Sequence, residues 1–150
     1  MKNKKRQIGQ TLVEFALILP IFLLLVIGFF DVGRAVFYYS SLTNAVREAT
    51  RFAIVNRDAI EKEISAGCDD GIEEHPLKLK VIESAFGINE DMLDPCTDIV
   101  VIVGKTGELF ETVSIEVTLN YEPITPLLSQ IVGGIPLVVQ SKMYVAPITR

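Results

Sequence analysis

The chain has 150 residues, of which 49% are hydrophobic, and its formal net charge is −5. This length accommodates one domain, or one small domain with an anchor. From residue 58 to the end, sixteen acidic residues stand against six lysines and arginines, and such an acidic surface argues against nucleic acid as a partner.

A long apolar run begins shortly after the N-terminus. Phe15 to Phe30 contains sixteen residues without a charge, and the stretch from Leu12 to Phe30, which includes Glu14, is nineteen residues long. As a helix these nineteen residues measure about 28 Å at roughly 1.5 Å per residue, close to the ~30 Å hydrocarbon core of a bilayer. The sequence therefore predicts one membrane-spanning helix.

The charges on either side of this run predict its orientation. The residues ahead of it include no acidic side chain and four basic ones, which are Lys2, Lys4, Lys5 and Arg6. Because positively charged flanks stay in the cytoplasm, we expect a single-pass protein of the inner membrane with a cytoplasmic N-terminus. The rest of the chain is then expected outside the cytoplasm.

The helical pattern continues beyond the apolar run, and we predict one helix over residues 10–56. In its second half, apolar residues recur at three- and four-residue steps, at Leu42, Ala45, Val46, Ala49, Phe52 and Ala53. This apolar stripe needs a cover, which either the chain's own C-terminal domain or a neighbouring subunit supplies. We expect the chain's own domain to cover part of its length.

Residues 57–150 are predicted to form an acidic, extracytoplasmic α+β domain. Pro76 in a first helical turn and apolar residues at helical spacing predict a helix over 76–86, which stops at Gly87. Alternating and β-branched residues predict three strands, at 98–103, 112–121 and 135–147. We expect a small antiparallel sheet that buries one face against the long helix, as in pilins.

Two cysteines, Cys68 and Cys96, lie in polar, loop-like segments. A compartment outside the cytoplasm permits disulfides. A bridge between them would close a loop of 28 residues and add roughly 3 kcal/mol in the chain-entropy model. Two unrelated thiols are the alternative.

No residue pattern in the sequence is typical of a catalytic or metal-binding site. The single histidine, His75, stands beside Glu73 and Glu74, whereas a metal site needs more ligands at defined spacing. We expect His75 at a solvated helix start. Hydrolase and nucleotide-binding motifs are missing, so we predict a protein that is not an enzyme and needs no cofactor or metal.

The segment IGQTLVEFALILP at residues 8–20 has three interpretations. The first is a generic signal anchor whose Glu14 reaches the cytoplasmic interface. The second is a secretory signal peptide, but aromatic and charged residues follow the apolar run where small residues would mark a cleavage site. The third is a leader cut ahead of the apolar run, which requires a basic leader, a small residue at the cut and an acidic residue soon after it. MKNKKRQIG followed by QTLVEF has all three features.

This pattern resembles a type IV prepilin leader, with Gly9 before the cut, Gln10 after it and Glu14 close behind. The pair Glu14 and Phe15 is similar to the glutamate–aromatic pair of Flp-type (type IVb) pilins of tight adherence systems. Over residues 9–53 the chain resembles the TadE-like pilus assembly proteins, which are minor pseudopilins of those systems. The features that carry this resemblance also include a proline within the apolar run, Asp31, Gly33 and Arg34, and a segment with Asn44, Ala45, Arg47, Glu48, Ala49 and Arg51.

The sequence departs from the family pattern in two respects. Val46 and Thr50 stand where the family more often has alanine or glycine. The C-terminal domain resembles the family only loosely, in a strand that ends at Tyr121, the Pro126–Leu127 turn and a final strand.

The resemblance implies that a membrane-embedded prepilin peptidase cuts between Gly9 and Gln10, leaving a basic leader of residues 1–9. It implies that Glu14, with Phe15 beside it, then acts in subunit assembly by neutralising the new α-amine of Gln10, often on an adjacent subunit. The implied partners are this peptidase, other pilin or pseudopilin subunits and the inner-membrane assembly platform, together with membrane lipid.

The implied function is that of a minor pilin or pseudopilin, which builds or primes a type IVb pilus and enters the extracellular fibre or only initiates it. The alternative is an unprocessed single-pass envelope protein whose acidic extracytoplasmic domain binds a partner.

Overall fold

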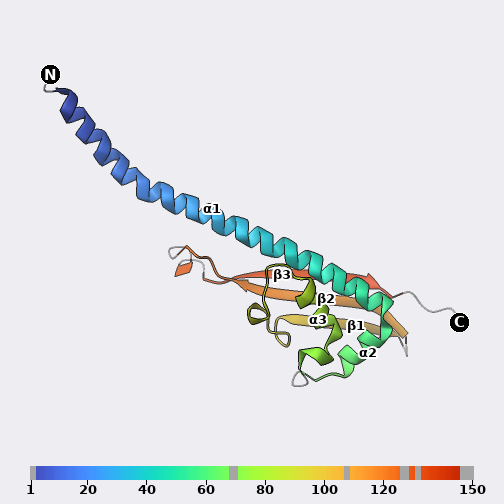
Figure 1. Cartoon of the computed structure of the whole chain (residues 1–150). Helices are drawn as coiled ribbons and strands as arrows, with labels where there is room; N and C mark the ends of the chain where they lie inside the picture. Colours follow the sequence, from blue (N-terminus) through green and yellow to red (C-terminus); the bar gives the residue numbers. More distant parts are fainter. Residues whose placement is uncertain (1–2, 68–70, 107–108, 126–128, 131–132, 146–150) are drawn as a thin grey trace. The chain divides into compact units, whose positions relative to one another are not determined.

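The fold is of the α+β class, as predicted (Figure 1). A computed structural model describes residues 3–67, 71–106, 109–125, 129–130 and 133–145. Its elements, in chain order, are α1 (Asn3–Val55), α2 (Arg57–Ser65), the 3-10 helix η2 (Ile72–Glu74), α3 (Pro76–Ser84), the 3-10 helix η3 (Glu90–Met92), and the strands β1 (Ile99–Thr106), β2 (Leu109–Tyr121) and β3 (Ile135–Tyr144).

The contacts within the chain divide it into two units, which are described separately. The first comprises Met1–Ala35 and Glu122–Gly134, and the second comprises Val36–Tyr121 and Ile135–Arg150. Helix α1 contributes its N-terminal part to the first unit and its C-terminal part to the second. Each unit therefore joins a piece of α1 to a segment that follows much later in the chain.

The second unit contains a three-stranded antiparallel sheet in the order β1-β2-β3 (Figure 1). Ile99 of β1 lies opposite Val117 of β2, which lies opposite Val139 of β3. All three side chains are buried. Because side chains alternate between the two faces of a strand, this register places the apolar residues of β2 on one face, as the alternation in the sequence predicted.

Strand β1 is longer than predicted, because it continues past Gly104 to Thr106. Gly104 lies just beyond the predicted strand, which ended at residue 103. In the structure, the pairing register between β1 and β2 shifts between Gly104 and Lys105, and such irregularities in a ladder often involve glycine.

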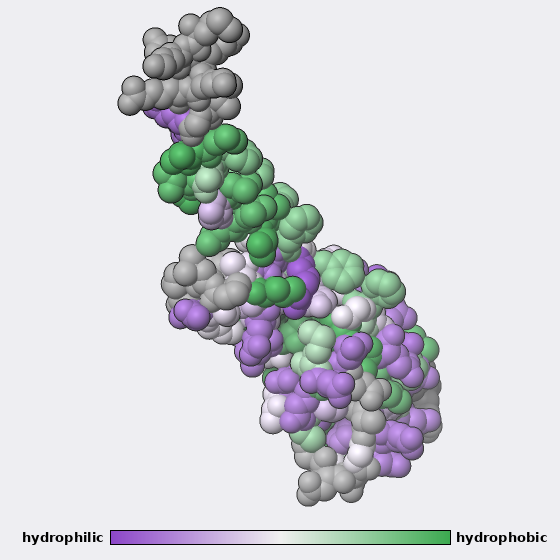
Figure 2. Space-filling model, turned by 60° about the vertical axis from the view of Figure 1, so that its left-hand side comes forward, coloured by the Kyte–Doolittle hydropathy of each residue, from purple (hydrophilic) through white to green (hydrophobic). Residues whose placement is uncertain are grey.

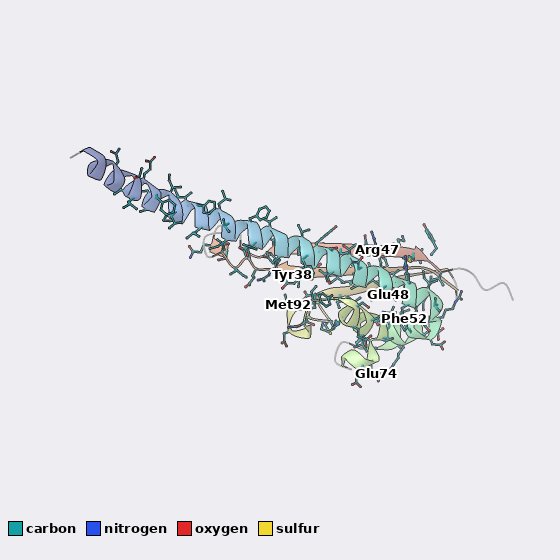
Figure 3. All side chains as sticks on the ribbon, turned by 45° about the horizontal axis from the view of Figure 1, so that its top comes forward. Tyr38, Arg47, Glu48, Phe52, Glu74 and Met92 are labelled. Atoms are coloured by element: carbon teal, nitrogen blue, oxygen red, sulfur yellow. The ribbon has the colours of Figure 1, made fainter. Side chains whose placement is uncertain are left out.

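The apolar stripe on the second half of α1 is covered by the chain's own domain. Leu42, Ala45, Val46, Ala49 and Ala53 are 0% exposed and join the sheet residues in one hydrophobic core, against which Phe52 packs. Arg47 and Glu48, which stand off the stripe, are exposed (Figure 3). The expectation that the domain covers part of α1 is confirmed.

The turn after α3 is joined to the same half of α1. Helix α3 ends at Ser84, and Gly87 then takes a positive φ of 78°, a conformation that glycine adopts with little strain. The hydroxyl of Ser41 donates a hydrogen bond of 2.7 Å to the carbonyl of Phe86, and the rings of Phe37 and Phe86 meet edge to face. These contacts fix where the chain leaves α3.

Candidate functional site

The four residues of the predicted processing and assembly site all lie in α1. Gln10 and Glu14 are four residues apart, so their side chains lie on the same helical face, one turn from each other. Phe15 is 61% exposed. Glu14 is also exposed, and no hydrogen bond or ion pair joins it to another residue in the described part of the chain. Its carboxylate is therefore available to a group outside this chain.

The N-terminal half of α1 exposes apolar side chains around its whole circumference. Every residue from 10 to 25 is exposed, with values such as 64% for Leu12 and 69% for Leu17. Figure 2 shows this surface as a continuous hydrophobic zone. Among the described helices, α1 is the one long and apolar enough to cross a membrane. A helix that is apolar all round is buried in protein or lipid.

The peptide bond predicted to be cut, between Gly9 and Gln10, lies inside α1. Within a helix, backbone N–H and C=O groups are hydrogen-bonded to residues one turn away, so a peptidase must first unwind this turn. Glycine lowers helix stability by about 1 kcal/mol relative to alanine. Gly9 therefore weakens the helix where the cut is predicted.

Asp31 forms a contact that the sequence did not predict. It is 5% exposed, and one carboxylate oxygen accepts a hydrogen bond of 3.0 Å from the backbone N–H of Ile124. The other accepts bonds from the backbone N–H of Thr125, at 2.9 Å, and from the Thr125 hydroxyl. Three donors thus satisfy one buried carboxylate. The sequence signal was Asp31 itself, an acidic residue directly after the apolar run.

The expectation for His75 was wrong. Its ring is buried rather than solvated, with 3% of the residue exposed. Nδ1 lies 3.0 Å from Oε1 of Glu63 on α2, and Nε2 lies 3.1 Å from the carbonyl oxygen of Gly67. The other oxygen of Glu63 accepts a bond of 2.9 Å from the backbone N–H of Leu77. Glu63 therefore joins α2 to the first turn of α3.

Of the two cysteines, Cys96 is disulfide-bonded. Cys68 lies outside the described residues, so the pairing of Cys68 with Cys96 stays a prediction. The backbone N–H of Cys96 donates a hydrogen bond of 2.8 Å to the side chain of Asp94.

The long apolar helix and the small α+β domain together fit a membrane-anchored protein. Residues 9–51 match the family model of TadE-like proteins, which confirms the resemblance over this segment. Over this segment the chain is therefore similar to TadE-like proteins, a family associated with pilus assembly. Comparisons with curated proteins and with solved structures gave no match.

The matched segment contains all four residues of the predicted processing and assembly site, as well as Asp31. It ends before the sheet begins. The similarity to the family therefore concerns the helix and does not extend to the sheet.

Proposed function

We propose that the chain is a minor pilin or pseudopilin of a tight adherence pilus, processed by a prepilin peptidase between Gly9 and Gln10. In this proposal α1 anchors the subunit in the inner membrane with its N-terminus in the cytoplasm. The α+β domain lies outside the cytoplasm. The subunit then enters the pilus or primes its assembly through contacts of α1 with other subunits and with the assembly platform.

The exposed carboxylate of Glu14, set in the apolar surface of α1, is the observation that carries this proposal. An ionised carboxylate within a membrane is unfavourable by roughly 2.5–3.5 kcal/mol at the centre of the bilayer and by less near the interface. The α-amine of a new N-terminus, which has a pKa near 8, offers a positive charge. Pairing the two charges removes much of this penalty, so Glu14 favours subunits that pack in register.

Processing has a second electrostatic consequence. Removal of residues 1–9 takes away four positive charges, which hold the N-terminus on the cytoplasmic side. The mature helix would keep one positive group near its start, the α-amine of Gln10. This change would let α1 move from the lipid into a fibre.

Intact mass and N-terminal sequence of the protein, extracted from membranes of cells that express a prepilin peptidase, test the proposal. We expect a start at Gln10 and a mass about 1 kDa below that of the full chain, since 150 residues weigh 16.6 kDa. Replacement of Gly9 by valine should prevent the cut, so that only the full-length chain is found. The predicted cleavage site requires a small residue at this position, and valine is larger and β-branched.

Gly28→Val, in the same helix but far from the cut, serves as the matched control and should be processed normally. A start at Met1 in the presence of the peptidase would contradict the proposal. The same holds for Gly9→Val protein that is cut at the normal position. Either result would favour an unprocessed single-pass envelope protein.

A further inference from the structure

A small cavity lies between α2, α3 and the outer edge of the sheet. Its volume is about 290 Å³, and its polar wall is formed by Glu63, His75 and Lys78. The rest of the wall includes Ile99 and Val101 of β1. All of these residues belong to the second unit. Cys96, which is disulfide-bonded, also lines the cavity, and a disulfide there restrains the loop ahead of β1.

Glu63 and His75 are hydrogen-bond partners in the wall of this cavity. Both partners of the His75 ring, the Glu63 carboxylate and the Gly67 carbonyl, are hydrogen-bond acceptors. The second oxygen of Glu63 accepts a hydrogen bond from the N–H of Leu77. Both carboxylate oxygens and both ring nitrogens therefore have partners within the chain, and the pair offers no free group to a ligand.

Lys78 supplies the remaining charge of the cavity wall. The residue is 9% exposed, and within the described ranges no carboxylate forms an ion pair with it and no acceptor forms a hydrogen bond with it. A neighbouring lysine of the same helix, Lys80, instead has a carboxylate partner, Glu83, at 3.8 Å. The stem of Lys78 is buried, and an ammonium that no carboxylate pairs with attracts a negatively charged acceptor, so the cavity favours a ligand that carries one.

Strand β1 adds a row of backbone groups to the same cavity. β1 forms one edge of the sheet, and the N–H of Thr118 donates to the carbonyl of Asp98 at 2.8 Å. In an antiparallel pair, the residues that bond to the partner strand alternate with residues that point away. Ile99 and Val101 therefore direct their N–H and C=O groups away from β2. These two residues line the cavity, so the free edge faces it.

We infer that this cavity binds an extended, acidic peptide segment of a partner protein. The segment pairs with β1 as a fourth strand, through the backbone groups of Ile99 and Val101, and places a carboxylate beside Lys78. Strand addition of this kind takes its affinity from main-chain hydrogen bonds and its specificity from side-chain pockets along the edge. The inference rests on the second unit alone and does not depend on the proposed function.

Binding of synthetic peptides to the full-length chain in detergent micelles tests the inference. The probes are acetyl-Thr-Val-Glu-Val-Thr-amide and the same peptide with glutamine in place of glutamate. We expect the glutamate peptide to bind at least roughly tenfold more tightly, because its hydrogen bond to Lys78 is charge-assisted. Hydrogen exchange at the amides of Ile99 and Val101 should slow when this peptide binds.

Lys78→Met should make the two peptides bind equally, and Lys80→Met is the matched control that should keep the preference. If Lys78→Met does not fold, the comparison of the two peptides on the unaltered chain still tests the inference. Equal binding of both peptides there, unchanged exchange at Ile99 and Val101, or no binding would overturn the inference. Glutarate that binds as tightly as the glutamate peptide would also overturn it, by indicating a small-anion pocket.

Discussion

The carboxylate of Asp31 binds both the backbone N–H and the hydroxyl of Thr125, ninety-four residues further along the chain. Asp31 directly follows the apolar run of α1, so this contact holds the segment of residues 122–125 at the point where the helix is expected to leave the membrane. Hydrogen bonds from Ile124 and Thr125 stabilise the buried carboxylate there.

Asp31→Asn should weaken this contact, although the asparagine side chain has nearly the same shape as aspartate. The amide nitrogen cannot accept a hydrogen bond, and it would face N–H groups that need an acceptor. We expect the loss of about 2 kcal/mol of local stability, which raises the hydrogen-exchange rate of the Ile124 and Thr125 amides roughly thirtyfold. Exchange measured by NMR or mass spectrometry on the full chain in micelles checks this.

Glu122→Gln is the matched control, because Glu122 belongs to the same segment and is exposed. It should leave both exchange rates unchanged. If Asp31→Asn has no larger effect than Glu122→Gln, the Asp31 contact does not hold the segment.

Local patterns were enough to predict most of the fold. Leu42, Val46 and Ala49 were assigned to a buried helical stripe from their spacing alone, and all three are fully buried. Alternation likewise predicted the buried face of β2. These predictions succeed because the period of a helix or strand is imposed on every residue in it.

Contacts between distant segments could not be predicted in this way. Nothing near Asp31 in the sequence indicates Thr125 as its partner, and nothing near His75 indicates that Glu63 will bury its ring. Each contact arises only once the fold has brought together two segments that lie apart in the sequence. The length of β1 was missed for a different reason, since a register shift lets the ladder continue past Gly104.

The buried pair of Glu63 and His75 should contribute measurably to stability. Glu63→Ala removes the acceptor of both His75 and the Leu77 N–H, so we expect a loss of about 3 kcal/mol in the free energy of unfolding. A double-mutant cycle with His75→Ala should give a coupling of about 2 kcal/mol. Denaturant unfolding in micelles provides the measurement.

Glu61→Ala, at an exposed position of the same helix, is the control and should change the free energy by less than about 0.5 kcal/mol. If the effects of the two single substitutions on the free energy of unfolding simply add in the double variant, the side chains of Glu63 and His75 act independently.

The same substitution should have opposite effects at two glycines. Gly87 has a φ of +78°, and a Cβ there would lie 3.1 Å from the Phe37 ring. Gly87→Ala should therefore lower the free energy of unfolding by about 1–2 kcal/mol. At Gly33, inside α1, a Cβ would meet no atom within 4 Å, so Gly33→Ala should stabilise the helix by about 0.5–1 kcal/mol.

Thermal unfolding of both variants in micelles tests this pair of predictions. If Gly33→Ala lowers the stability instead, another surface must pack against Gly33 in solution that does not contact it in the single chain. A neutral Gly87→Ala would mean that the turn after α3 relaxes without strain.

A bridge between Cys68 and Cys96 should appear in peptide maps of the non-reduced protein as one linked fragment. Reduction, or Cys96→Ser, should then lower the free energy of unfolding by roughly 3 kcal/mol, because the unfolded chain regains the freedom of a 28-residue loop. Fragments that link two copies of the chain through Cys96 would contradict the intramolecular pairing.

Glu14→Gln separates anchoring from assembly. The glutamine removes the charge and lowers the penalty for burial in lipid, so the variant should insert into the membrane and be cut after Gly9 as before. It cannot neutralise the α-amine of Gln10 on a neighbouring subunit. We therefore expect normal amounts of processed protein but a roughly tenfold loss of crosslinks between α1 and other pilin subunits, since one paired charge is worth about 1.4 kcal/mol or more in a membrane.

Glu48→Gln provides the control for this last experiment, because Glu48 is exposed on the same helix but lies beyond the apolar run (Figure 3). Crosslinking should be the same for this variant and for the unaltered chain. If Glu14→Gln subunits crosslink as well as those of the control, the carboxylate serves no assembly contact, and its position near the start of the run is explained by access to the cytoplasmic interface alone.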